Sequence, residues 1–524
     1  MTFQSETAES RPKTLSGFRS ARTFTVALTA CFFAADLFNL LHHEMWRDEL
    51  QAWLIATHSN SILELVKNIR YEGHPPVWFL LLYVITRFTH WAGAMQLLNL
   101  AIATATTYLI AAYSPFTRMQ KVLLCFGYFP LYEYGTISRN YAVGLLFLFW
   151  FCAWYRPDRK QNWVVAMLLL SLLANTSVYG AMIAMAFAFS FFAFPAATSG
   201  GMRKFLAERG THVGVGALVF LAGIAIAILQ MHPPPDSGLA VGWHFPMTVF
   251  GVRRTLTGLW RAFLPIPSSL AEFWNSNFFF STRTMVLQTR WVMLGAAVML
   301  STVFLLLVRK PYALLAYFLT TTGILTFMHV KFFGYERHLG HLFIVFIASL
   351  WIAARLPEHV PAVHPLERAS RFVGLQGSKI ITCLLLVQFA VAAMASWSDY
   401  RRPFSQAKAV AMFLRSRGMA NMFIVADEDY VVMTVAGYLD REVYYPRSQR
   451  MGSFLIWNQS RHPRNVIAEA TTIATSRKEE VLIISDAPLQ TEGTSAHKIS
   501  EFTGSIAQEN YYLYSVASSP GNGS

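Results

Sequence analysis

The chain has 524 residues, of which 54% are hydrophobic, 15% aromatic and only 14% charged. So few charges exclude an ordinary soluble protein of this length and indicate a membrane protein that crosses the bilayer many times. The net charge of +14 is explained first by topology and anionic lipid, so we expect no nucleic-acid partner. The cysteines lie in apolar runs and offer neither a disulfide framework nor a CxxC metal site: Cys31, Cys125, Cys152 and Cys383.

The N-terminal tail, residues 1–22, precedes a first apolar run over 23–41. This run is long, contains Asp36 and lacks a small-residue cleavage site after it, which predicts a retained span and not a signal peptide. Further runs follow near 76–92, 94–113, 121–135, 141–155, 162–178, 180–197, 212–231, 291–308, 311–328, 341–354 and 380–397. The stretch 163–197 has no charge and is long enough for two spans, with a break near 175–180.

The positive-inside rule fixes the predicted orientation. The basic segments 11–22, 156–160, 203–209, 309–310 and 355–379 all face the cytoplasm only if one run before residue 155 does not cross. The best candidate is 74–91, "HPPVWFLLLYVITRFTHW", because its tandem prolines suit a helix start and Arg87 and His90 interrupt its far end. This predicts an integral protein of the bacterial inner membrane, with a polytopic α-helical module of about eleven transmembrane helices over 23–397 and a cytoplasmic N-terminus.

Two outer loops carry unusual sequences. In the first, 42–93, "RDELQAWLIA" and "SILELV" predict an amphipathic helix along the membrane surface, with Trp46 and Trp53 as interface anchors. The second, 232–290, holds five arginines against two acids: Arg253, Arg254, Arg261, Arg283 and Arg290 against Asp236 and Glu272. Long loops obey the charge rule weakly, and these arginines are equally suited to an anionic ligand.

Residues 398–524 change in character. The segments "MFIVA", "EVYYP", "VLIIS" and "YYLYSV" predict strands, and helical patterns lie near 404–418 and 430–438. We expect a small extracytoplasmic α/β domain. Its "VADEDY", with Asp427, Glu428 and Asp429, contains a DxD pattern, but no glycine-rich phosphate loop accompanies it, so acidic turn residues are the better interpretation.

Three polar clusters fall on the outer face in this topology. They are Asp48 and Glu49 with His74, then "EYGTISRNYA" (133–142), and "HVKFFGYERHLGH" (329–341). Ionisable residues at the ends of spans are costly unless they are paired or functional, so we predict that the three clusters share one cavity. The alternative for the first cluster is that its acids only charge the first turn of a helix, which the helix dipole favours.

The carboxylate pair after the first span, "YEGHPPVW" and "SRNYA" together resemble the GT-C superfamily of membrane glycosyltransferases. That superfamily includes protein O-mannosyltransferases, lipid A aminoarabinose transferases and the catalytic subunits of oligosaccharyltransferases. The resemblance covers the layout of most of residues 20–400. It implies a polyprenyl-phosphate sugar donor, an inverting transfer to an unknown glycan, lipid or protein acceptor, and a first-loop acid that activates the acceptor. Asn140 stands where oligosaccharyltransferases place nearby acids, which argues against metal-dependent N-glycosylation.

The chemistry assigns roles within these motifs. Asp48 is the expected base and Glu49 the second choice, because adjacent helical residues point about 100° apart. Cations stabilise a departing phosphate, and the predicted donor-phosphate residues are Arg139, Arg337 and Lys331. The predicted substrate-binding residues are His74, Tyr141, Glu336 and His338.

Each role has a structural alternative. Arg139 could instead snorkel from the end of its span. Glu336 and Arg337 could form a self-contained ion pair, and Lys331 could be an interface anchor. No cofactor is firmly predicted, and a divalent cation on Asp48 and His74 stays open. A polymerase or ligase of lipid-linked glycans is an alternative function, because such enzymes also present arginines to diphosphates on the outer face, as the arginine-rich loop could do. A lipid or sugar transporter is disfavoured, because mid-span charges are nearly absent apart from Asp36.

Overall fold

The computed structural model describes residues 15–157, 162–198, 201–238, 242–245, 247–280 and 289–517. Within these ranges seven helices are long and apolar enough to cross a bilayer: α1 (Leu15–His42), α5 (Gly93–Tyr113), α10 (Met202–Met231), α12 (Thr289–Leu307), α13 (Pro311–Val330), α14 (Glu336–Ala353) and α15 (His364–Arg401). Four shorter apolar helices accompany them: α4 (Val77–Thr86), α7 (Asn140–Trp154), α8 (Trp163–Ala174) and α9 (Val178–Thr198). The basic residues Arg11, Lys13, Arg159, Lys160 and Arg283 lie outside the described ranges.

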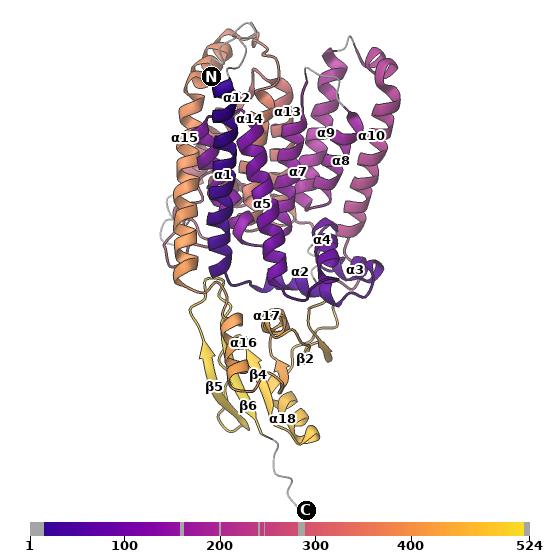
Figure 1. Ribbon diagram of the computed structural model, residues 1–524, viewed down its shortest axis with the longest axis vertical. Helices are drawn as coiled ribbons and strands as arrows, with labels where there is room; N and C mark the ends of the chain where they lie inside the picture. Colours follow the sequence, from indigo (N-terminus) through magenta and orange to yellow (C-terminus); the bar gives the residue numbers. More distant parts are fainter. Residues whose placement is uncertain are drawn as a thin grey trace, which may run out of the picture.

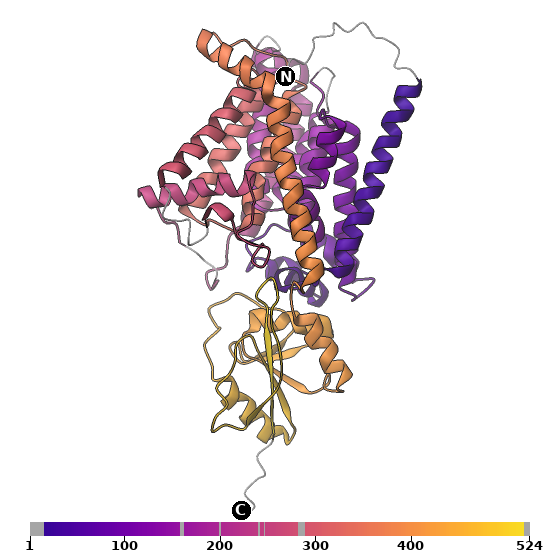
Figure 2. The same cartoon turned by 90° about the vertical axis from the view of Figure 1, so that its left-hand side faces the viewer.

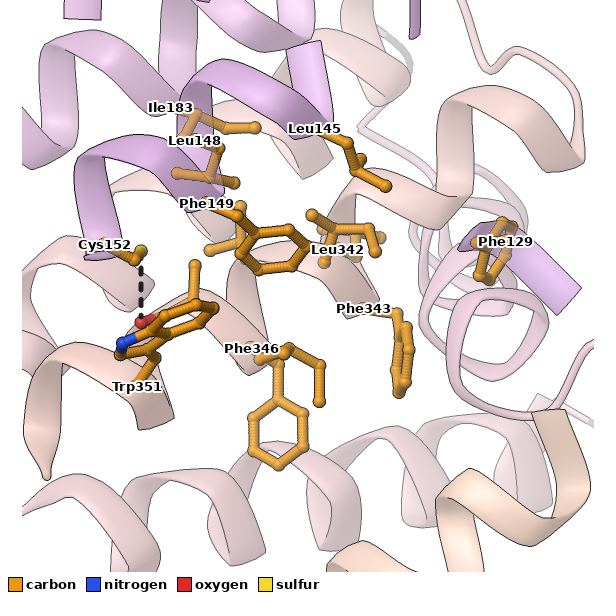
Figure 3. Packing of buried hydrophobic residues seen from close by; sticks show 14 of the residues in the cluster. Phe129, Leu145, Leu148, Phe149, Cys152, Ile183, Leu342, Phe343, Phe346 and Trp351 are labelled. Atoms are coloured by element: carbon orange, nitrogen blue, oxygen red, sulfur yellow. Dashed lines mark hydrogen bonds between the residues drawn. The ribbon is translucent and has the colours of Figure 1, made fainter. Parts of the chain in front are cut away.

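Figure 1 shows these helices side by side in one bundle, with the start of α1 at its upper end and a small sheet domain below its lower end. The polytopic helical architecture with a C-terminal sheet, as expected from composition and pattern, is therefore confirmed. Helix α14 stands in the middle of the bundle, and all but one of its 18 residues are buried. Around it Phe149 stacks on Trp351 with ring centroids 5.6 Å apart, and Phe343 and Phe346 fill the neighbouring space (Figure 3).

Helix α4 occupies the run that was expected not to cross. Its ten residues rise only about 15 Å, half of the roughly 30 Å hydrocarbon core. The helix begins directly after Pro76, and Trp78, Phe79 and Leu82 on it are buried in a cluster shared with α2 (Arg47–His58). It lies at the lower end of the bundle beside α2 and α3 (Ile62–Ile69), as Figure 1 shows.

The run 121–135 is not the single helix that its hydropathy suggests. It is divided into α6 (Arg118–Cys125) and a π-helical segment, η1 (Tyr128–Thr136), by an extended Gly127. All nine residues of η1 are buried, and η1 packs against α5 and α15. π-Helical turns occur frequently at functional sites because they re-aim side chains, and this one leads directly into the "SRNYA" motif.

The two tryptophans that were expected to anchor a surface helix are instead core residues. Trp46 is 3% exposed and Trp53 is 2% exposed. Trp46 meets Trp274 edge-on at 4.7 Å and also contacts Phe404. The anchor prediction is wrong because α4 on one side and α17 (Asp429–Leu439) of the C-terminal domain on the other cover α2.

The C-terminal domain is built on a six-stranded mixed sheet of order β3-β2-β1-β4-β6-β5. The four expected strands are present: β1 (Phe423–Ala426), β2 (Val443–Tyr445), β4 (Val481–Ser485) and β6 (Tyr511–Val516). The expected helices are α16 (Ala407–Ser416) and α17. The pattern missed β3 (Arg450–Gly452), β5 (Ala496–Phe502) and α18 (Val466–Arg477), because β3 has three residues and β5 is mostly polar. Only the β1–β2 and β1–β4 pairings are parallel.

One long helix links the bundle to this domain. Helix α15 has 38 residues and runs from the upper end of the bundle down to the sheet domain (Figure 2). At its lower end Asp399 is buried beside the end of α1, where the first outer loop begins.

Candidate active site

Asp48 is held between two arginines from distant parts of the chain. Its Oδ2 atom lies 2.6 Å from Nη1 of Arg139 and 3.1 Å from Nη2 of Arg337. Asp48 is in the first turn of α2, Arg139 is the N-cap of α7, and Arg337 is in the first turn of α14. The structure thus brings the three polar clusters of the sequence to one point, at the end of the bundle that faces the sheet domain.

The two arginines keep Asp48 ionised. Burial by itself raises the pKa of this carboxyl, but the charges of Arg139 and then Arg337 lower it to about 2. Arg337 is also enclosed by aromatic rings, because its guanidinium lies 4.7 Å from the ring centre of Tyr335, 5.4 Å from Trp46 and 5.9 Å from Trp274. These ring faces attract the guanidinium by cation–π interactions.

Glu49 points away from Asp48 into a buried network. Its carboxylate accepts hydrogen bonds from the backbone amides of Ser138 at 2.7 Å and Trp46 at 3.2 Å, and it contacts Nε2 of His43 at 3.1 Å. Nδ1 of His43 lies 2.7 Å from Asp399. Glu49 therefore ties α2 to the "SRNYA" motif, and this placement suits a structural role better than the second-choice catalytic one.

His43 is the cation of this network. Burial lowers its pKa, but the carboxylates of Asp399 and Glu49 outweigh that effect and raise the pKa to about 10. A protonated imidazolium between two buried carboxylates, with the Tyr132 hydroxyl donating to Asp399 at 3.0 Å, joins the ends of α1 and α15 to α2 and η1.

Glu336 and Arg337 do not form the self-contained pair that the sequence left open. Nε of Arg261, on α11 (Val249–Phe263), donates to Glu336 at 2.9 Å, while Arg337 reaches Asp48. Both residues belong to the first turn of α14, which begins at Glu336 and not near 341 as the hydropathy suggested. The apparent charged loop is therefore a helix N-terminus.

The other predicted site residues contact different groups around the site. His74 lines the same cavity, and burial followed by the charge of Arg139 lowers its pKa to about 3, so it is neutral. The ring of Tyr141 lies 5.8 Å from the Arg139 guanidinium, and His338 stacks on Tyr179 at 5.4 Å. The ammonium of Lys331 lies 5.0 Å from the ring centre of Trp243.

The cavity beside Asp48 has a volume of about 280 Å³ and includes residues that sequence reasoning missed. They are Arg47, Gln51, Glu72, Tyr430, Met433 and Trp457. Burial raises the pKa of Glu72 to about 7. Glu72 stands inside the "YEGHPPVW" motif and was therefore within reach of sequence reasoning. Tyr430 closes the "VADEDY" motif and Met433 lies in the predicted helix 430–438, but nothing in the sequence connected them or Trp457 with the first outer loop.

A second cavity, of about 380 Å³, lies along α11. Arg253, Arg254 and Arg261 line it together with Phe250 and Phe333, and the Arg254 guanidinium lies 5.0 Å from the Phe333 ring centre. Because Arg261 is bonded to Glu336, this cavity adjoins the helix turn that carries Arg337. Three of the arginines of the 232–290 loop, those on α11, thus lie beside the site.

Two groups of acids were considered as metal ligands: Asp48 with His74, and the acids of "VADEDY". In the described part of the chain, no group of three or more His, Cys, Asp or Glu side chains is placed to hold a metal ion. Asp48 is occupied by two guanidinium groups, and His74 is its only predicted metal partner. The acids of "VADEDY" also have internal partners: Asp427 accepts from Ser485, Glu428 pairs with Arg447 and Asp429 with Arg461.

Two crystal structures of ArnT from Cupriavidus metallidurans share this fold. For ArnT bound to undecaprenyl phosphate the TM-score is 0.52 at 11% sequence identity, covering 94% of this chain and 98% of ArnT. For the apo state the TM-score is 0.52 at 12% identity, covering 95% and 98%. No family model and no curated protein matches the sequence significantly. ArnT is a GT-C transferase, so the fold that the sequence motifs implied is confirmed.

Proposed function

We propose that this chain, with the GT-C fold as its scaffold, transfers a sugar from a polyprenyl-phosphate donor to an acceptor outside the cytoplasm, with inversion. The observation that carries the proposal is Asp48 between Arg139 and Arg337, at the edge of a cavity. The undecaprenyl phosphate in the ArnT structure of the same fold supports the class of donor.

In the proposed reaction the donor phosphate takes over the two guanidinium groups. Arginine binds phosphate oxygens with paired hydrogen bonds, so Arg337 and Arg139 turn from Asp48 to the phosphate. Asp48 is a weak base while both arginines hold it, and it becomes more basic when they leave. Its carboxylate then removes the proton of the acceptor hydroxyl, the acceptor oxygen bonds to the anomeric carbon, and the bond from that carbon to the phosphate oxygen breaks.

We infer the topology from the same arrangement. The seven long helices, the shorter α7, α8 and α9, and the α6–η1 pair make about eleven crossings of the bacterial inner membrane. An odd number agrees with the start of α1 and the sheet domain lying at opposite ends of the bundle (Figure 1). With a basic, cytoplasmic N-terminus, Asp48 and the sheet domain are extracytoplasmic.

The test of this proposal is transfer from radiolabelled undecaprenyl-phosphate hexose by the purified full chain in lipid nanodiscs. We expect Arg337→Gln to lower kcat/KM at least about 100-fold, because a preorganised cation for the leaving phosphate is worth that much. Arg337→Lys keeps the charge and should be intermediate. Arg118→Gln, whose side chain is bonded to Ser20 near the N-terminal end, is the control. Equal transfer by wild type and Arg337→Gln would refute the phosphate role.

We place the approach of the donor phosphate along α11. Arg254 lines the second cavity, and losing one charge-assisted hydrogen bond to phosphate costs about 1.5–3 kcal/mol. Arg254→Gln is therefore expected to raise the KM for the donor about tenfold or more while kcat stays within about twofold. An unchanged donor KM would remove α11 from the donor path.

The same cavity favours a second candidate function. Three arginines around one space suit a diphosphate as well as a monophosphate, as in a polymerase or ligase of lipid-linked glycans. Turnover of an undecaprenyl-diphosphate oligosaccharide, with none of the monophosphate hexose, would establish that alternative.

A further inference from the structure

We infer that the cavity between α2 and the C-terminal domain is the acceptor site and that the acceptor it takes is a saccharide. The inference rests on the proposed function and names its second substrate. Asp48 lines this cavity on the bundle side, and Tyr430 and Trp457 line it on the side of the C-terminal domain. An acceptor hydroxyl bound here is within reach of the proposed base.

The far wall is an aromatic surface of fixed orientation. The rings of Tyr430 and Trp457 have centroids 6.1 Å apart and are tilted by 33°. Arg47 lies 5.3 Å from the Tyr430 ring centre, and Arg461 lies 4.9 Å from the Trp457 ring centre. Both rings are half-buried, so each keeps exposed surface. Aromatic faces bind the C–H side of a pyranose ring, because those hydrogens carry partial positive charge and the ring face is electron-rich.

Arg461 is itself held in place from behind. Its Nε donates to Asp429 Oδ2 at 2.8 Å, and its Nη2 pairs with the other oxygen of the same carboxylate. Asp429 is buried in the first turn of α17. Asp429 of "VADEDY" thus orients Arg461 and, through it, the aromatic wall.

Planar polar side chains line another part of the cavity, beside the apolar Ala52, Trp78, Phe79 and Met433. Nε2 of Gln51 donates to Glu72 at 2.8 Å, and the Glu72 carboxyl lines the cavity together with Asn140. Carboxyl, amide and guanidinium groups each present two adjacent hydrogen-bonding atoms, which match two hydroxyls of one sugar ring. A lipid chain would leave these groups unpaired at a cost of about 1–3 kcal/mol each.

In an in-line displacement the acceptor oxygen and the leaving phosphate lie on opposite sides of the anomeric carbon, so the two substrates need separate places beside Asp48. Arg337 and its aromatic neighbours Trp274 and Tyr335 are absent from the residues that line this cavity. The donor phosphate at Arg337 therefore lies outside the lining of this cavity, whereas Arg139 and Asp48 belong to the lining and are shared by the two substrate sites. A volume of about 280 Å³ is near the lower end of ligand pockets, about 300–1,000 Å³, which suits a terminal sugar unit.

The experiment measures saccharide binding without donor. The full chain in nanodiscs is mixed with methyl glycosides of mannose, glucose, galactose and N-acetylglucosamine, and saturation-transfer NMR reports binding. We expect at least one glycoside to bind, Trp457→Ala to lower its signal at least fivefold, and Trp457→Phe to retain most of it. Trp397→Ala, at a tryptophan that is 55% exposed on α15, is the matched control and should leave the signal unchanged.

A kinetic readout separates this role from a structural one. With the glycoside as acceptor, Trp457→Ala should raise the acceptor KM about tenfold and leave the donor KM unchanged. Undecaprenyl phosphate binding by native mass spectrometry is measured on the same samples. Three results would overturn this inference and leave the proposed function standing. They are binding of undecaprenyl phosphate without binding of any glycoside, a glycoside signal in Trp457→Ala equal to that of the wild type, and transfer to serine peptides but not to glycosides. If the wild type does not bind undecaprenyl phosphate, the proposed function is overturned.

Discussion

Asp48→Asn is expected to lower the rate of sugar transfer at least about 100-fold, since general-base catalysis contributes about 10²–10⁴ and an amide has no comparable basicity. Binding of undecaprenyl phosphate should be retained or tightened. The reason is that the substitution releases Arg139 and Arg337 from an ion pair that competes with the phosphate. Single-turnover transfer and native mass spectrometry of carrier binding measure the two effects separately.

The matched control is Asp440→Asn. Asp440 ends α17 in the left-handed region at φ 55°, a conformation that asparagine adopts readily. Full transfer by Asp48→Asn would remove the assignment of the base. If Glu72→Gln were then inactive, the base would be Glu72, whose pKa of about 7 also suits proton transfer near neutral pH.

His43→Ala is expected to destabilise the protein by about 3–5 kcal/mol, the typical result of removing one partner from a buried ion pair. The alanine leaves the carboxylates of Glu49 and Asp399 buried and facing each other without their cation. Thermal unfolding in nanodiscs measures the loss, and His497→Ala, at an exposed position on β5, is the control. A melting temperature equal to that of the wild type would show that the network is not ionic.

The pH dependence of this effect has a definite sign. The pKa of His43 is raised from 6.5 to about 10 in the folded state. Its stabilising contribution is therefore complete below about pH 6.5, declines as the pH rises towards 10, and is absent above that value. The difference in stability between wild type and His43→Ala should accordingly be larger at pH 6.5 than at pH 10.

Much of the fold and the centre of the site could be predicted because both follow from the free-energy cost of exposing apolar surface to water and of leaving charges unpaired at the membrane. Long apolar runs must be buried in lipid, and charges such as Asp48, Arg139 and Arg337 at the ends of such runs need partners. Those two requirements were enough to predict that three clusters separated by up to 289 positions meet.

The rest depended on contacts that leave no local trace. Trp46 and Trp53 have the pattern of interface anchors, and the elements that cover them, α4, Trp274 and the C-terminal domain, are distant in sequence. Trp457 lies outside any regular helix or strand, so no periodicity marks it. The start of α14 was placed too late because Glu336 and Arg337 resemble a loop, although an acid in the first turn of a helix is favourable.

The contact between Gln51 and Leu455 has a consequence for biogenesis. The Gln51 side chain donates to the carbonyl of Leu455 at 2.7 Å and accepts from its amide at 3.1 Å, as a neighbouring strand would do. Position 455 follows all the candidate spans in the described part of the chain, so it is synthesised after them, and until then the cavity beside Asp48 lacks the wall that Tyr430 and Trp457 form. Under the proposed function, the chain therefore has no complete acceptor site until its C-terminal domain has folded and docked on α2.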